Sequence, residues 1–192
     1  MRKFFPVLAA ISIATLAGCS TVPQPKSSNV TAKAPVGKPA PYRWTQGAAP
    51  KAHGDMVAAF HRAGLKPGEF LWAEKIPAAG DTRVIVDLLT QMAYVYRGEQ
   101  LIGATTISSG KRGKETPLGF WSVLEKKKFH RSRKYDDAPM PFMQRLDEFG
   151  IALHGGSLPG YPASHGCVRL PMKFAERLYG LTKLGSKVVI EG

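Results

Sequence analysis

The 192-residue chain contains only two cysteines, Cys19 and Cys167. Two cysteines cannot build the dense disulfide framework that stabilises many small exported domains. If one of them is consumed by modification, no disulfide is possible within the mature chain. Unpaired thiols are unusual in oxidising compartments, so the sequence indicates that Cys167 is a reactive residue.

Acidic residues are also scarce. The chain has 14 Asp and Glu against 27 Lys and Arg, which gives a formal net charge of +13 at pH 7. A basic surface attracts nucleic acid, anionic membranes or polymers that carry carboxylates, and charge alone does not choose among them. The hydrophobic content of 44% is normal for a globular core and argues against wholesale disorder.

The apolar N-terminal stretch, residues 4–18, is fifteen residues long and is shorter than the roughly 20 residues of a spanning helix. It follows Arg2 and Lys3, as the apolar region of a signal peptide follows its positive segment. Residues 1–18 are therefore predicted to be a leader. Arg2 and Lys3 carry two of the thirteen net positive charges, which leaves +11 in the mature chain.

The leader ends in Leu16-Ala17-Gly18-Cys19, which resembles a bacterial lipobox. This resemblance implies that Cys19 receives diacylglycerol and that the chain is a lipoprotein of the cell envelope, anchored on the periplasmic side. The alternative is an ordinary secretory leader with a cysteine by chance. Ser20 stands where an aspartate would resemble an inner-membrane retention signal, which favours the outer membrane.

Residues 19–42 are predicted to be the lipidated cysteine and a proline-rich tether. Prolines alternate there with Ser, Thr, Ala and Lys, and almost no large apolar side chain interrupts them. Such a stretch cannot bury enough surface to fold. At about 3.1 Å per residue in the polyproline II conformation, it would span roughly 65 Å.

The rest of the chain is predicted to be mostly β with one or two short helices. Residues 43–80 are expected to form an N-terminal extension with a short helix that Asp55 caps and Gly64 ends. Residues 81–192 are expected to form the main domain. Apolar or alternating runs predict strands at residues 83–89, 92–97, 101–107, 120–124, 151–154 and 187–190. Pro171 is predicted to open a helix that ends near Gly180.

Residues 154–171 carry the chemistry. They combine the lone Cys167 with two histidines, an arginine and several glycines and prolines, a pattern typical of a rigid, tightly turned loop. A free thiol has a pKa of about 8.5, so a neighbouring imidazole is needed to take its proton, and an adjacent cation would lower that pKa. Gly166 lets backbone N–H groups approach a developing oxyanion. These groups suffice for acyl transfer through a thioester.

The segment resembles the signature of the L,D-transpeptidase (YkuD-type) catalytic domain family, a histidine followed downstream by Ser-His-Gly-Cys-x-Arg. Here these are His154 and residues 164–169. Residues 116–119, Thr-Pro-Leu-Gly, are similar to the family's Thr-Pro-x-Gly strand start, and residues 130–141 resemble a stretch of one proteobacterial branch. The resemblance runs from about residue 80 onward. The ten-residue step from His154 to residue 164 is shorter than in several members, which bears on loop shape and substrate preference.

The resemblance implies a role for each matching residue. Cys167 is the nucleophile, and His154, oriented by the backbone carbonyl of Gly155, is the base that activates it and relays the proton. The oxyanion site is expected from Ser164 and His165, together with backbone N–H groups near Gly166 and Cys167.

Two further expectations concern the groove. Arg169 would bind a stem-peptide carboxylate or brace the loop through its five donors. The donor groove would be walled by Tyr161 and residues 140–143. The family reaction takes a tetrapeptide stem of peptidoglycan as donor and an amine as acceptor, needs no cofactor or metal, and involves no nucleic acid. The acceptor is left open among another stem, a protein side chain, a free D-amino acid and water.

Alternatives accompany this interpretation. A hydrolase of the same fold would cleave peptidoglycan peptide or peptidoglycan–protein bonds, and a wall-binding module would hold stems without chemistry. Cys167 could be an inert small hydrophobe, and His154 a satisfied residue at a strand end. A zinc site made of His154, His165 and Cys167 has ligands of the right type, but their spacing fits no familiar zinc pattern.

Overall fold

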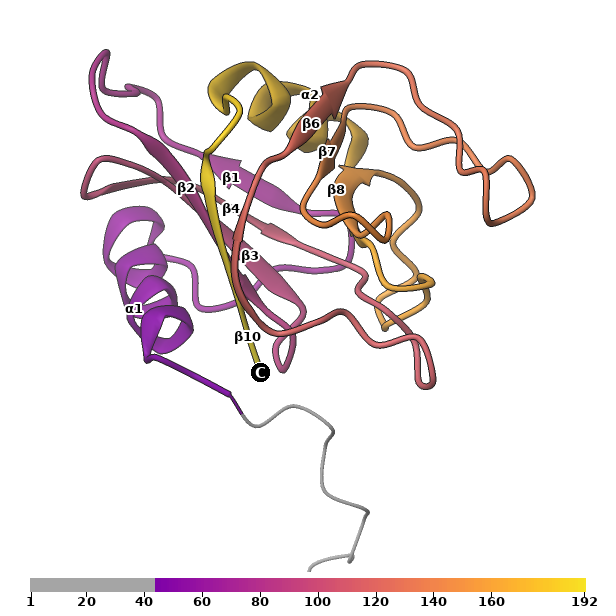
Figure 1. The fold of residues 1–192 in the computed structure, drawn as a ribbon. Helices are drawn as coiled ribbons and strands as arrows, with labels where there is room; N and C mark the ends of the chain where they lie inside the picture. Colours follow the sequence, from indigo (N-terminus) through magenta and orange to yellow (C-terminus); the bar gives the residue numbers. More distant parts are fainter. Residues whose placement is uncertain (1–43) are drawn as a thin grey trace, which may run out of the picture. The chain divides into compact units, whose positions relative to one another are not determined.

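A computed structural model describes residues 44–192 of the chain (Figure 1). The predicted leader, the lipidated cysteine and the tether lie outside these residues. Within residues 44–192, ten strands and two helices form a mostly β fold, which confirms the predicted fold class. No helix of this part of the chain is long and apolar enough to cross a membrane.

The larger sheet has six strands. In spatial order they are β1 (Phe70–Trp72), β4 (Gln100–Thr106), β3 (Met92–Arg97), β2 (Thr82–Asp87), β10 (Lys187–Glu191) and β5 (Gly119–Ser122). The pairing of β2 with β10 is parallel, and the other pairings are antiparallel. Its central strands are buried on both faces, which explains why β2 and β3 are nearly continuous apolar runs and do not alternate.

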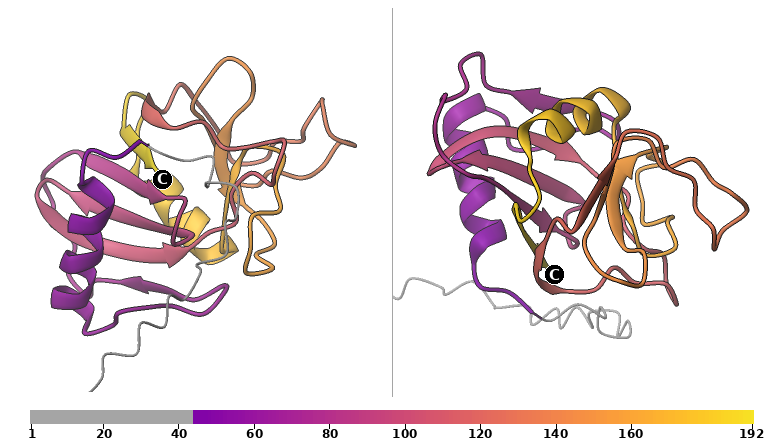
Figure 2. Two further views of the ribbon diagram at one scale, coloured as in Figure 1. Left: turned by 90° about the horizontal axis from the view of Figure 1, so that it is seen from below. Right: turned by 45° about the horizontal axis from the view of Figure 1, so that its top comes forward.

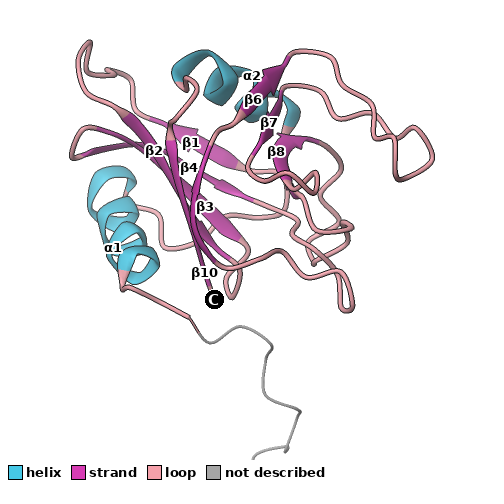
Figure 3. Ribbon diagram, viewed as in Figure 1, coloured by secondary structure: helices cyan, strands magenta, loops and turns pink. Residues whose placement is uncertain are grey.

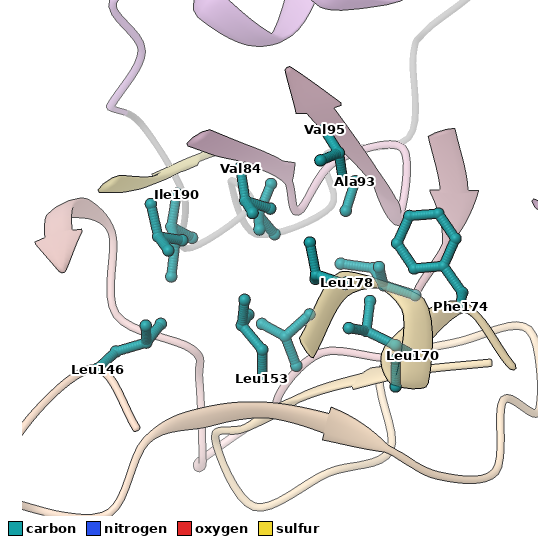
Figure 4. Close-up of a cluster of buried hydrophobic side chains, with 14 of the residues drawn as sticks. Val84, Ala93, Val95, Leu146, Leu153, Leu170, Phe174, Leu178 and Ile190 are labelled. Carbon is teal, nitrogen blue, oxygen red and sulfur yellow. The ribbon is translucent and has the colours of Figure 1, made fainter. Parts of the chain in front are cut away.

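Different elements cover the two faces of this sheet (Figures 1 and 2). Helix α1 (Ala48–Phe60) packs against Ile85, Tyr94 and Tyr96 on one face. On the other face, α2 (Met172–Leu181) and the second sheet enclose the main core, shown in Figure 4. Alternate residues of the same strands therefore enter two separate cores. Helix α2 begins one residue after Pro171, as predicted.

The smaller sheet has four short strands, and loops occupy most of the chain around it (Figure 3). In spatial order they are β6 (Glu125–Lys127), β7 (Met143–Arg145), β8 (Ala152–Gly155) and β9 (Val168–Leu170). β6, β7 and β8 pair antiparallel, whereas β8 and β9 pair in parallel. This parallel pair joins the two segments that the sequence analysis singled out for chemistry.

The predicted limits of the first helix were wrong. Helix α1 begins at Ala48, and it ends at Phe60 with His61 in a left-handed conformation, so neither Asp55 nor Gly64 bounds it. Asp55 lies inside the helix, where it accepts hydrogen bonds from Lys51 and from the Tyr96 hydroxyl, both at 2.6 Å. The residues that set the true start are distant in sequence.

That start is held by Glu191, the last residue of β10. The Glu191 side chain is only 1% exposed and accepts four hydrogen bonds. Their donors are the Thr45 hydroxyl at 3.1 Å and the backbone N–H groups of Gln46 at 2.7 Å, Ala48 at 3.2 Å and Ala49 at 2.7 Å. A carboxylate at a helix N-terminus satisfies free N–H groups and complements the helix dipole.

Replacing Glu191 with Ala is expected to lower the free energy of unfolding by about 2–4 kcal/mol, because three backbone N–H groups lose a charged acceptor. Burial acts to raise the pKa of Glu191, but the surrounding donors outweigh it and lower that pKa below its usual range. The stabilisation by Glu191 is therefore fully present above its unfolded-state pKa of about 4.3. It is lost as pH falls through the lower pKa of Glu191 in the folded protein. Urea unfolding at pH 7 and pH 3 measures both effects.

Glu99 provides the matched control. Its carboxylate pairs with Arg83 at 3.0 Å but is 90% exposed, so Glu99→Ala is expected to change the free energy of unfolding by less than about 1 kcal/mol. Equal losses from the two substitutions would contradict the capping role of Glu191.

Candidate active site

A cavity of about 870 Å³ lies over β8 and β9 and is bounded by the 147–150 turn, the loop 128–142 and the segment 164–167. Six of the predicted site residues line it: His154, Gly155, Ser164, His165, Cys167 and Arg169. Gly166 and Tyr161 do not line it. The fold thus brings the histidine and the thiol of the motif to one cavity.

The register of the parallel β8–β9 pair explains how this happens. Leu153 is paired with Val168, and His154 with Arg169. Cys167 directly precedes β9 and therefore lies beside Ala152, whose N–H group points at the sulfur. Cys167, at the entry to β9, is consequently offset by two residues along the sheet from His154 on the neighbouring strand β8.

His154 is fixed as a neutral base. Its side chain is 7% exposed, and its Nδ1 lies 2.8 Å from the carbonyl oxygen of Gly155. A carbonyl only accepts hydrogen bonds, so Nδ1 carries the proton and Nε2 keeps a free lone pair. Burial lowers the pKa of His154 to about 4, the Gly155 hydrogen bond acts in the opposite direction, and Arg169 and His130 lower it further.

Cys167 is a protonated thiol in the resting state. Burial raises its pKa, the Ala152 N–H group acts against this, and Asp147 adds to the increase. Arg169 lowers the pKa of the thiol, as expected for an adjacent cation, but its effect is smaller than that of burial. The sulfur lies 3.5 Å from the carbonyl oxygen of Gly150. The pair therefore rests as neutral thiol and neutral imidazole.

The loop before Cys167 is braced through Ser164. The Ser164 hydroxyl donates to the carbonyl of Cys167 at 2.5 Å and accepts the Gly166 N–H at 3.0 Å. The Ser164 N–H itself donates to Ser109 O at 3.0 Å. The Ser164 hydroxyl and the Gly166 N–H, both expected to shape an oxyanion site, are thus engaged within the loop. Among residues 44–192, the Cys167 N–H, also expected at that site, donates to no protein acceptor.

Thr116 holds the other side of this loop, and the sequence analysis gave it no role in the site. It is buried, and its hydroxyl accepts the Gly110 N–H at 2.9 Å and donates to the Gly166 carbonyl at 2.8 Å. Gly166 has φ 120°, a conformation that favours glycine, and an added Cβ would lie 2.6 Å from Ile151 Cδ1. The Thr-Pro-Leu-Gly segment thus fixes the nucleophile loop from outside the motif.

His165 joins the cavity to the loop 128–142. Its ring stacks on Tyr135, with centroids 4.3 Å apart and planes at 14°. Burial, Lys111 and Arg169 lower the pKa of His165. The stack holds the loop 128–142 against the segment that carries the nucleophile. Tyr135 had no signal in the sequence, because its partner is thirty residues away in a loop.

Arg169 and Tyr161 differ in position. The aliphatic part of Arg169 packs over Gly156, whose added Cβ would lie 3.2 Å from Arg169 Cγ, and its guanidinium makes no ion pair within residues 44–192. Tyr161 is 61% exposed and lies outside the cavity, where its carbonyl accepts the Ser108 hydroxyl at 2.8 Å. The expectation that Tyr161 walls the groove is wrong, whereas Met140 does line it.

The described residues, 44–192, contain no group of three His, Cys, Asp or Glu side chains arranged to hold a metal ion. His154, His165 and Cys167 thus do not form the zinc cluster considered from the sequence. The fold and the cavity define a small β-rich domain in which a histidine of β8 and a cysteine at the entry to β9 line one cavity.

Residues 81–190 match the YkuD family, the L,D-transpeptidase catalytic domain. This match covers more than half of the chain, and the chain belongs to that family. A comparison with curated proteins finds no match.

Among solved structures, 47 chains match. An L,D-transpeptidase from Mycobacterium smegmatis superposes with a TM-score of 0.54 at 19% identity, covering 58% of this chain and 59% of that one. One from Stackebrandtia nassauensis gives 0.55 at 26% identity, covering 72% and 65%. LdtMt1 in complex with imipenem gives 0.52 at 18% identity, covering 57% and 58%. The chain thus spans less than two thirds of the length of these structures.

Proposed function

We propose that this protein is a peptidoglycan L,D-transpeptidase with Cys167 as nucleophile and His154 as general base. The observation that carries the proposal is the single cavity lined both by the Cys167 thiol and by the neutral imidazole of His154 with its free Nε2. Family membership supports the substrate class, the stem peptides of peptidoglycan. No cofactor or metal is needed for this chemistry.

In the first half-reaction, the Cys167 sulfur attacks the carbonyl on the L-centre of the third, diamino-acid residue of a tetrapeptide stem. The thiol proton moves to His154 Nε2, a C–S bond forms, and the C–N bond to the terminal D-alanine breaks as Nε2 returns the proton to the leaving amine. The free Cys167 N–H is the donor for the transient oxyanion, and Arg169 attracts a carboxylate of the stem.

The resting protonation states set when this attack occurs. The raised pKa of Cys167 and the lowered pKa of His154 make proton transfer unfavourable in the free enzyme. A thiolate therefore forms only as the C–S bond develops and the oxyanion is stabilised. This arrangement keeps the partly buried thiol protonated between turnovers and limits its oxidation, because the thiolate is the reactive species.

The second half-reaction passes the acyl group to an amine of another stem or of a protein. Transfer to water would make the protein a hydrolase. The deciding experiment incubates the purified mature chain, in detergent, with disaccharide tetrapeptides and analyses the products by mass. A crosslinked dimer supports transpeptidation, a trimmed monomer supports hydrolysis, and unchanged substrate supports a wall-binding module. Because LdtMt1 of the same fold was solved with imipenem, we expect a single imipenem adduct at Cys167.

The same proposal includes the location of the enzyme. Cys19 carries lipid on the periplasmic side of the envelope, and residues 20–41 allow the domain to reach the wall. Wild-type protein is expected in the detergent-extracted membrane fraction. A variant with the leader exchanged for an ordinary secretory signal and with Cys19→Ala is expected to be soluble, with unchanged turnover on isolated substrate. Its crosslinking in cells should fall, since tethering raises effective concentration. Wild-type protein in the soluble fraction would refute the lipoprotein assignment.

A further inference from the structure

Arg169 has a fixed place along the β8–β9 pair, opposite His154, and Arg133 and Lys134 also line the cavity. Within residues 44–192, none of these three cations makes an ion pair. The 147–150 turn lies at the other end of β8, next to the sulfur of Cys167. Along the strand pair, Cys167 therefore lies between Arg169 and the turn.

The turn presents a carboxylate. Two glutamates line the cavity, Glu125 and Glu148. Glu125 is neutralised by Lys127 and Arg145, both at 2.7 Å, and these hydrogen bonds lower its pKa to about 2. Glu148 has no ion pair in the described part of the chain, and its side chain is exposed. It is the uncompensated negative charge of the cavity wall.

Hydrogen bonds within the 147–150 turn fix the backbone that carries Glu148. The Asp147 carboxylate accepts the N–H groups of Gly150 and Ile151, both at 2.8 Å, which fixes the turn. Gly150, at the end of the same turn, places its carbonyl oxygen 3.5 Å from the Cys167 sulfur. Phe149 lines the cavity beside Glu148 and is 77% exposed, so an apolar surface adjoins the charge. The turn thus offers an incoming molecule both a carboxylate and an apolar contact.

We infer that Glu148 is the residue that selects an amine over water as acceptor, and that the acceptor approaches Cys167 over the 147–150 turn. This inference rests on the proposed function and names the acceptor side of the same cavity. Arg169 matches a carboxylate of a donor stem, which leaves the turn for the second substrate.

The chemistry explains the selection. An amine that attacks the Cys167 thioester forms a C–N bond and acquires positive charge on nitrogen before it loses a proton. His154 Nε2 takes that proton and passes it to the sulfur as the C–S bond breaks, which regenerates the thiol. A carboxylate on the side of attack stabilises the cationic nitrogen. Water activated by His154 loses its proton during attack and gains less from Glu148.

The test measures how the acyl-enzyme divides between water and amine. The purified mature chain is acylated with p-nitrophenyl acetate, and the products are analysed with glycinamide as acceptor. Glu148→Gln is expected to lower the ratio of acetylglycinamide to acetate by about 3- to 10-fold, less at high salt, because the site is open to solvent. Glu148→Asp should retain most of the wild-type ratio. Glu176→Gln, the same charge change on an exposed residue of α2, should leave it unchanged.

An unchanged ratio in Glu148→Gln would overturn the inference, as would an equal loss in Glu176→Gln. The assay does not depend on the natural donor. An enzyme that forms the acetyl thioester but leaves disaccharide tetrapeptides intact would refute the proposed function, and the partition ratio would still decide the role of Glu148.

Discussion

Replacing Cys167 with Ser is expected to lower transpeptidation by roughly 10³-fold or more while the protein remains folded. An alcohol is far less acidic than a thiol, and the imidazole that must deprotonate it has a pKa of only about 4. A base so weak cannot generate an alkoxide at neutral pH. The amount of crosslinked dimer formed from disaccharide tetrapeptides, measured by mass, gives the loss, and circular dichroism checks the fold.

The covalent adduct provides the control for this substitution. Wild-type protein incubated with imipenem should gain the mass of one molecule, and the Cys167→Ser protein should gain none under the same conditions. An adduct that persists in the variant would show that another residue is the nucleophile.

Replacing His154 with Ala is expected to lower the rate of acylation by roughly 10²–10⁴-fold, the usual contribution of a general base. His165 is the matched control, because it lines the same cavity but stacks on Tyr135. His165→Ala should therefore cost much less. Stopped-flow detection of p-nitrophenol release gives both rates. If His154→Ala stays within a few fold of wild type, the proton goes to His165 or to water.

The pH dependence of the acylation rate gives a second test of His154 as the general base. Burial lowers the pKa of His154 to about 4, so the neutral base persists well below the usual histidine value of about 6.5. Wild-type acylation should thus fall only as pH drops through about 4. The His154→Ala protein should lack this limb. A wild-type rate that already falls at pH 6.5 would contradict the lowering of the His154 pKa by burial.

The predictability of the fold depended on strand length and on the range of the contacts. The long apolar runs of β2, β3, β4 and β10 are visible in the sequence because both faces of the larger sheet are buried. The strands β1, β6, β7 and β9 have three residues each, too few to show a period. The start of α1 was missed because its capping carboxylate comes from Glu191.

The predictability of the site also depended on whether the contacts were local or distant in sequence. Cys167 and His154 were predicted as nucleophile and base because residues 154–169 resemble a local family signature. The hydroxyl of Thr116 and the ring of Tyr135 act through partners fifty and thirty residues away, which no local pattern reports. The Gly166 N–H was assigned to the oxyanion because glycine leaves the backbone open, but Ser164 already occupies it. Hydrogen-bond competition within a loop is settled only by the folded arrangement.

The hydrogen bonds between Glu191 and α1 also determine when parts of the fold can form during translation. Strand β2 has no parallel neighbour until β10 is made, a hundred residues later, and α1 has no cap until Glu191 is added. At about 5–20 residues per second, the ribosome needs several seconds to make that interval. Contacts so distant in sequence close slowly. The nascent chain therefore cannot complete the pairing of β2 or the cap of α1 before β10 has been made.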